Sequence, residues 1–160
     1  MGYYFDINGT INCSNNRAYM ILKYLFKESR YPFNEGVEDF DFDDNSNSIE
    51  ICCNIKNYNE YIERVCFFIH ELDKEAQGTI ELIGEDSNDR FEVSLCEKGI
   101  KLGVAEVIWK HQKGYYENKD TSKELNKILK DKNLNKNLIV CSLEEKKWQS
   151  KKNRQKNLLK

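Results

Sequence analysis

Apolar and polar positions alternate at the start of the chain. From residue 3 to residue 13 the apolar side chains, among them Phe5, Ile7 and Ile11, occupy odd positions, while the even positions are largely polar. Alternation with a period of two is typical of a half-buried strand. The pair Asn8-Gly9 is a strong turn signal, so the segment is predicted to be either one strand or a short hairpin.

Two later segments carry apolar residues at the spacing of a helix. Residues 15–29 are predicted to form the first helix, with Ser14 as its N-cap. Asn57 and Glu60, spaced like a capping box, precede the second helix, which is predicted to stop near residues 77–78. The apolar stripe of this second helix comprises Tyr58, Tyr61, Ile62, Val65, Cys66, Ile69 and Leu72.

Further alternating runs predict strands around Phe40 and Phe42 and at residues 49–55, 79–83, 90–96 and 100–109. The turns between the last three runs are too short for a parallel crossover, so these strands are predicted to be antiparallel neighbours. The order β-α-β-β-α-β-β-β predicts an α+β fold, in which a mostly antiparallel sheet has two helices packed on one face. Residues 1–109 are expected to form this body and to fold independently.

The character of the sequence changes at Lys110. Residues 1–109 hold 10 Lys and Arg against 21 Asp and Glu, whereas residues 110–160 hold 15 against 6. The second part is predicted to be a basic C-terminal extension with a short helix, an extra strand at residues 138–141 and a polar tail. Thr121 and Glu124 are spaced like a capping box for the helix. Its apolar stripe consists of Leu125, Ile128 and Leu129.

The location of the protein is predicted from the absence of targeting signals. The chain opens without a basic and apolar leader and has no apolar run near the roughly 18 residues that span a membrane. A cytoplasmic protein without membrane contact is therefore expected. The six cysteines include no C-x-x-C pair, which disfavours a zinc site, and they are expected to be free thiols. Neither a metal nor a cofactor is expected.

Two acidic groups are candidate partner-binding residues. Asp39, Asp41 and Asp43 alternate with phenylalanines, about 6.6 Å apart in a strand, and Asp44 extends the charge. This spacing is about twice the 3.4 Å between phosphates along one strand of B-DNA, so the row can imitate nucleic acid toward a basic groove; the alternative is a solvated sheet edge. The second group can contact a partner or a cation, or can simply stabilise a turn. It consists of Glu85, Asp86 and Asp89.

The basic end of the chain supports an alternative function. Basic residues around a single tryptophan can bind nucleic acid through phosphate contacts and base stacking. A solvated terminus and a tail that docks on the acidic body are the other interpretations. The candidate nucleic-acid-binding residues are Lys146, Lys147, Trp148, Lys151, Lys152, Arg154 and Lys156.

Motifs of catalysis are not evident in the sequence. It contains no nucleophile elbow, no phosphate-binding glycine loop and no H-E-x-x-H. The two histidines are His70, predicted to be partly buried beside the second helical stripe, and His111. A Cys-His pair keeps an undetected enzyme open as an alternative, but a protein without catalytic activity is favoured.

Five short motifs occur together: MGYY at residues 1–4, GTI at 9–11, GTIE at 78–81, GEDSND at 84–89 and EVIW at 106–109. As a set they resemble a domain-of-unknown-function family of small bacterial and phage proteins, over about residues 1–109. The resemblance implies no activity, but it implies a phage or mobile-element protein that acts inside a bacterial host cell. The expected function is to bind and modulate a host protein or ribonucleoprotein with a basic groove, as an anti-CRISPR inhibitor of a defence system does.

Overall fold

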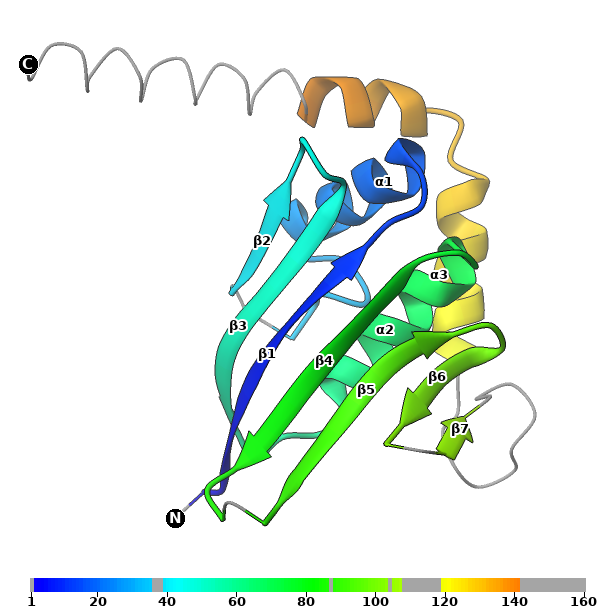
Figure 1. Cartoon of the computed structure of the whole chain (residues 1–160). Helices are drawn as coiled ribbons and strands as arrows, with labels where there is room; N and C mark the ends of the chain where they lie inside the picture. Colours follow the sequence, from blue (N-terminus) through cyan, green and yellow to red (C-terminus); the bar gives the residue numbers. More distant parts are fainter. Residues whose placement is uncertain (1, 36–38, 87, 104, 108–118, 142–160) are drawn as a thin grey trace, which may run out of the picture.

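The computed structural model describes residues 2–35, 39–86, 88–103, 105–107 and 119–141. Seven strands form one sheet in the order β2-β3-β1-β4-β5-β6-β7 (Figure 1), and every neighbouring pair is antiparallel. The predicted α+β class with an antiparallel sheet is confirmed. The elements are β1 (Tyr4–Asn12), α1 (Asn16–Lys27), β2 (Phe40–Asp43), β3 (Ser48–Lys56), α2 (Tyr61–Leu72), β4 (Gln77–Gly84), β5 (Arg90–Cys96), β6 (Gly99–Leu102), β7 (Ala105–Val107) and α3 (Lys119–Leu129).

Strand β1 lies between β3 and β4 and runs without interruption through Asn8 and Gly9, so the hairpin alternative is wrong. Gly9 is required for a different reason. A Cβ atom at this position would lie 2.3 Å from the Thr79 carbonyl oxygen and 2.8 Å from the Ile80 Cα. The small residue therefore allows close approach of β1 to β4 rather than a turn.

The run at residues 100–109, predicted as one strand, contains two. The chain reverses after β6 at Gly103, whose φ of +62° lies in the left-handed region that glycine adopts readily. Ala105 of β7 then pairs with Leu102 of β6.

The start of α1 differs from the predicted cap. Asn15 caps the helix, because its side-chain oxygen accepts a hydrogen bond from the Ala18 N–H at 2.8 Å. Ser14 instead donates its backbone N–H and its hydroxyl to the Asp73 carboxylate, at 2.6 and 2.5 Å. The Ser14 prediction is wrong because a residue distant in sequence, just after α2, takes both of its donors.

The start of α2 also lacks the predicted capping box of Asn57 and Glu60. Glu60 is the N-cap residue, but it has a left-handed backbone and its side chain makes no capping hydrogen bond. The Tyr58 hydroxyl accepts the Ile62 N–H at 3.1 Å in its place.

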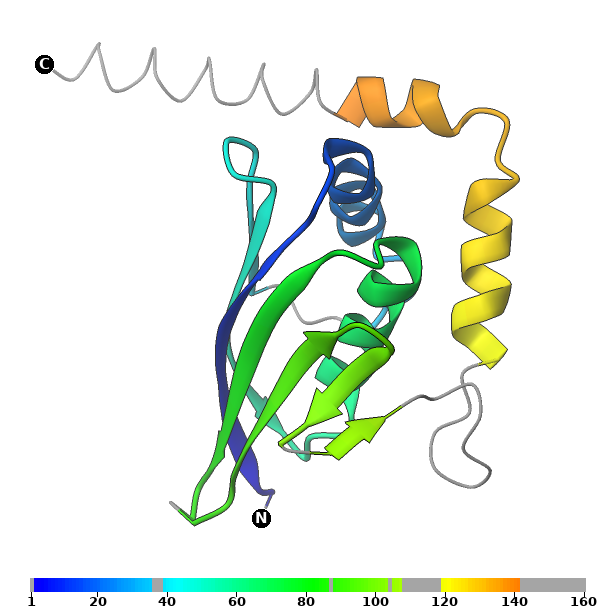
Figure 2. The same cartoon turned by 45° about the vertical axis from the view of Figure 1, so that its right-hand side comes forward.

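The molecule is built in layers. Helices α1 and α2 pack on one face of the sheet, and α3 lies on the far side of α2 (Figure 2). Ile62, Val65 and Ile69, predicted to face the core, are fully buried. The opposite side of α2 is buried too, since Phe67 and Phe68 are inaccessible to solvent. A helix that is apolar all round needs cover on both sides, and α3 contributes part of that cover.

Residues of the predicted extension belong to the same hydrophobic core as the sheet. Ile128, Leu134 and Leu138 are buried within that core. The hydroxyls of Tyr31 and Thr121, 2.8 Å apart, join α3 to the segment that follows α1. Whether residues 1–109 fold without residues 110–160 stays a prediction, but the division does not coincide with a boundary of the core.

Three details predicted for the extension are wrong. The capping box of Thr121 and Glu124 is absent, because α3 already begins at Lys119. Leu129 is exposed rather than part of the buried stripe. Residues 134–141 are helical, so there is no extra strand at residues 138–141.

Candidate interaction surface

One face of the sheet is not covered by any described helix, as seen from the front in Figure 1. Strand alternation places the apolar residues toward α1 and α2 and polar residues on this open face. Its exposed side chains are mostly short and polar. They include Asp6, Asn8, Thr10 and Asn12 of β1, Glu50 and Asn54 of β3, and Gln77 and Thr79 of β4.

The edge of this face at β2 carries three carboxylates that we call the acidic edge: Asp39, Asp41 and Glu50. All three are exposed, and none forms a hydrogen bond or ion pair with its side chain among the described residues. Asp41 and Glu50 are direct cross-strand neighbours. Like charges in this position destabilise a sheet, typically by about 0.2–1 kcal/mol. The edge thus retains a small electrostatic cost that a cationic partner would relieve.

The two phenylalanines of β2 hold the acidic edge in place. Phe40 is 5% exposed, and its ring centroid lies 5.3 Å from that of Phe33 and 5.5 Å from that of Phe26. Phe42 packs against Phe26 at 5.3 Å. Aromatic contacts at such distances add to the burial of the rings. The carboxylates of β2 therefore project from a strand whose other side is anchored in the core.

The remaining two residues of the predicted row bond within the molecule. The Asp43 carboxylate accepts hydrogen bonds from the Asn45 N–H at 3.0 Å and the Ser46 hydroxyl at 2.8 Å, which is the ordinary role of Asp in a turn. Asp44 accepts the Tyr19 hydroxyl at 2.6 Å and the Lys23 ammonium at 2.9 Å. These contacts fasten the β2–β3 turn to α1.

The second acidic group also bonds within the molecule. The Glu85 carboxylate accepts the Tyr4 N–H at 3.0 Å, and that of Asp86 accepts the Asn88 N–H at 3.0 Å. The Tyr3 hydroxyl accepts the Asp86 N–H at 3.1 Å and donates to Asp89. The group stabilises the β4–β5 turn and joins it to the start of β1. Contact with a partner stays a prediction for these residues.

Several other predicted features fall outside the described residues, namely His111 and the whole basic group from Lys146 to Lys156. His70 is buried, and its Nε2 atom lies 3.1 Å from the Glu97 carbonyl oxygen. No cluster of three or more His, Cys, Asp or Glu side chains within the described ranges is arranged to hold a metal ion. In the same ranges no helix has the length and apolar character of a membrane span.

All six cysteines are free. Cys52 is exposed on the open face, whereas Cys53 is half-buried on the side of the helices. Burial raises the pKa of the Cys13 thiol to about 12 and that of Cys53 to about 11, and nearby carboxylates add to both shifts. Burial also raises the pKa of Cys66. These three thiols are therefore protonated at neutral pH and are poor nucleophiles.

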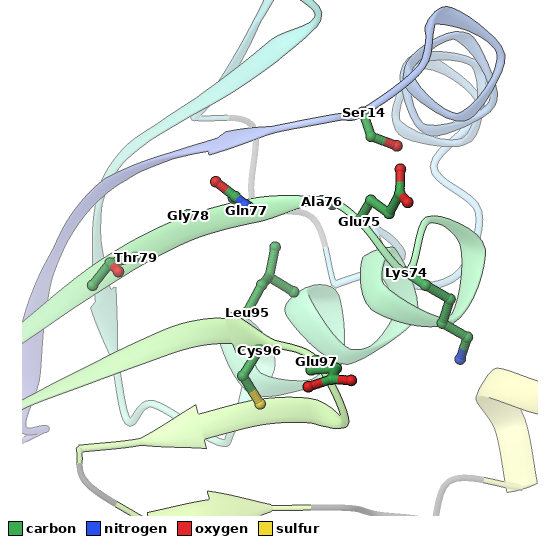
Figure 3. Close-up of a pocket in the computed structure, with 10 residues that line it drawn as sticks. All are labelled: Ser14, Lys74, Glu75, Ala76, Gln77, Gly78, Thr79, Leu95, Cys96 and Glu97. Carbon is green, nitrogen blue, oxygen red and sulfur yellow. The ribbon is translucent and has the colours of Figure 1, made fainter.

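A pocket with both polar and apolar lining lies where the end of β5 passes the turn between α2 and β4. Figure 3 shows the side chains of Ser14 and Glu75 pointing toward each other at one rim, while the Cys96 sulfur lies on the opposite side of β5 from Leu95. Glu97 contributes a second carboxylate. The lining offers hydroxyl and carboxylate acceptors for a polar or cationic group, and the Ser14 hydroxyl is already bonded to Asp73.

In comparisons with protein-family models, curated proteins and solved structures, nothing matches this chain. The resemblance to a family of small bacterial and phage proteins therefore stays a hypothesis.

Sequence reasoning missed Glu50 as a member of the acidic edge. Its outward orientation follows from the alternation of strand β3, which the sequence did show. Its position opposite Asp41 follows only from the register of β2 and β3. The role of Lys23 as the cation paired with Asp44 has no signal in the sequence, because the two residues are joined only by tertiary packing.

Proposed function

We propose that the protein works by binding, without catalysis, and that its acidic edge engages a basic groove on a host protein or ribonucleoprotein. The observation that carries this proposal is the set of three exposed carboxylates, Asp39, Asp41 and Glu50, whose side chains have no partner among the described residues and which lie on an anchored sheet edge. In the cytoplasm of a bacterial host, such an edge in a phage or mobile-element protein would inhibit a defence complex by occupying its nucleic-acid groove.

Electrostatics support this mode of action. Charged surfaces of opposite sign accelerate encounter and fix orientation more than they raise affinity. The attraction between exposed carboxylates and a basic groove is screened by dissolved ions, so binding loses affinity as salt rises. Binding through the acidic edge is therefore expected to weaken steeply with ionic strength.

The experiment is an interference assay in bacteria that carry an active CRISPR system, followed by binding of the purified effector complex. The triple variant D39N/D41N/E50Q removes the acidic edge. The matched control E75Q/E92Q/E97Q removes the same charge from exposed glutamates elsewhere. The parent and the control are expected to restore phage growth and to bind the effector, whereas the acidic-edge variant does neither.

Equal activity of the parent and both variants would overturn the role of the acidic edge. If the parent neither restores phage growth nor binds the effector, this target is wrong. In that case salt-dependent binding of labelled single-stranded DNA or RNA, abolished by charge reversal at Lys146, Lys147 and Lys151, would favour the nucleic-acid-binding alternative.

A further inference from the structure

The segment at residues 57–60, between β3 and α2, has a strained backbone. Asn57 and Glu60 have φ values of 53° and 56°. The left-handed region is unfavourable for residues other than glycine, by roughly 1–2 kcal/mol, and less for asparagine. Such strain persists only where surrounding contacts hold the backbone in place. At the start of the segment, the Asn57 N–H donates a hydrogen bond to the Tyr3 carbonyl oxygen at 2.7 Å.

Tyr58 supplies the contacts that hold this segment. Its hydroxyl oxygen accepts the Ile62 N–H at 3.1 Å, and its own proton is donated to the Glu63 carboxylate. Its ring packs against Phe5 at 5.6 Å and Phe91 at 6.4 Å between centroids. One side chain thus caps α2, bonds a carboxylate and completes an aromatic cluster at the end of the sheet.

Glu63 is 2% exposed, although it carries an ionisable group. Helix α2 packs on β5 and β6, whose inward side chains are apolar, and α3 also packs on it. The groups that face Glu63 include Tyr58, Glu60 and Arg64, and the thiol of Cys66 is also influenced by its charge. Arg64 is itself paired with Glu35. The inward residues of β5 and β6 are Phe91, Val93, Leu95, Ile100 and Leu102.

Opposing effects act on the carboxyl group of Glu63. Burial and the negative charge of Glu60 disfavour the charged carboxylate. The hydrogen bond from Tyr58 and the positive charge of Arg64 favour the charged carboxylate. Burial is the larger effect and raises the pKa of Glu63 from its ordinary 4.5 to about 7. Burial likewise raises the pKa of Tyr58, which therefore remains a hydrogen-bond donor at neutral pH.

We propose that Tyr58 and Glu63 form a pH-sensitive latch: closure of residues 57–60 on the start of α2 buries the Glu63 carboxyl group and is favoured while that group is neutral, and its ionisation favours an open segment. In the open form the carboxylate reaches water, the strained backbone relaxes and the ring cluster of Phe5, Tyr58 and Phe91 becomes accessible. The device lies at the opposite end of β1 from the β2–β3 turn and does not depend on the acidic edge.

The direction of the pH dependence follows from proton linkage. The closed form binds more protons than the open form between pH 4.5 and about 7, so closure is favoured at low pH and is lost as pH rises through 7. If opening restores the ordinary pKa, the opening equilibrium constant increases on the order of 30-fold between pH 5.5 and pH 8.

Hydrogen exchange of the Ile62 amide, followed by NMR in the full chain and corrected for intrinsic exchange, measures this opening. The protection of Ile62 is expected to fall on the order of 30-fold from pH 5.5 to pH 8, while the Leu22 amide of α1 keeps its protection. In E63Q the protection of Ile62 should not change with pH. The control E75Q removes an exposed carboxylate outside the latch, so the pH dependence of Ile62 protection should persist.

Two measurements keep the test decisive if E63Q fails to fold. In the parent, the side-chain carbon-13 resonance of Glu63 should titrate near pH 7, and a titration near 4.5 would overturn the latch. In Y58F, which keeps the ring, Ile62 should lose protection at every pH while the helical circular dichroism is retained. Unchanged protection in Y58F, or pH-independent protection in the parent, would also overturn the proposal.

Discussion

The pair Ile128 and Leu129 tests whether α3 is part of the cooperative core. Both are aliphatic and adjacent on the last turn of the helix, but Ile128 is 1% exposed and Leu129 is 58% exposed. Truncation of a buried isoleucine to alanine typically costs about 2–5 kcal/mol, because it combines lost burial with a cavity. An exposed substitution usually stays within about 0.5 kcal/mol.

Stability is measured by urea unfolding, with circular dichroism and tyrosine fluorescence as independent probes. We expect I128A to lower the free energy of unfolding by about 2–5 kcal/mol and the melting temperature by roughly 4–20 °C. L129A is expected to leave both nearly unchanged. The two probes should report one transition for each protein, since a single cooperative unit unfolds as a whole.

The refuting result is an I128A variant as stable as L129A. It would mean that α3 rests on the molecule without sharing its cooperative unfolding. The predicted independence of residues 1–109 would then hold, and a chain truncated after Lys113 would melt at the temperature of the parent.

Three further outcomes are expected. D44A removes one partner of Lys23, whose side chain is only 9% exposed, and should cost about 1–3 kcal/mol in urea unfolding; K23M/D44A should recover part of that loss. G9A places a methyl group against the β4 backbone and should lower stability by about 1–3 kcal/mol, so a melting temperature equal to that of the parent would show that β1 and β4 can separate. Maleimide at neutral pH should label Cys52, which is exposed, well before Cys66, which is buried, and equal labelling rates would contradict the burial of α2.

The alternation of apolar residues was sufficient to predict most of the strands, since one side of each faces a core. The caps were not predictable in the same way. Ser14 has the chemistry of an N-cap, but it bonds Asp73, which is 59 positions away. The segment at 138–141 is a short apolar run of the kind that periodicity cannot assign. There, Leu134, Leu138 and Cys141 follow the helical spacing of a buried side, which is visible only when the run is extended backward.

The acidic edge was predictable only in part, for a related reason. The alternation of Asp39 and Asp41 with two phenylalanines correctly predicted exposed carboxylates above an anchored strand. Which carboxylates remain without partners depends on contacts between elements. Asp44 bonds α1, while Glu50 comes beside Asp41 through strand pairing. A row of carboxylates identified along one strand therefore includes residues such as Asp44, which bond within the molecule. It also omits residues such as Glu50, which strand pairing brings beside the row.

The composition of α2 explains why the molecule needs a layer beyond its sheet and two helices. Residues 65–69 are five consecutive apolar side chains, a run that covers every side of a helix rather than one stripe. The sheet buries Val65 and Ile69 on one side, and Phe68 on another side contacts Tyr31 at 5.8 Å, whose hydroxyl meets Thr121 of α3. This apolar run is the feature of the sequence that predicts another layer of the chain over α2. Helix α3 contributes to this cover even though most of its residues are polar, because Ile128 is buried in the core while Lys123 and Lys127 stay exposed.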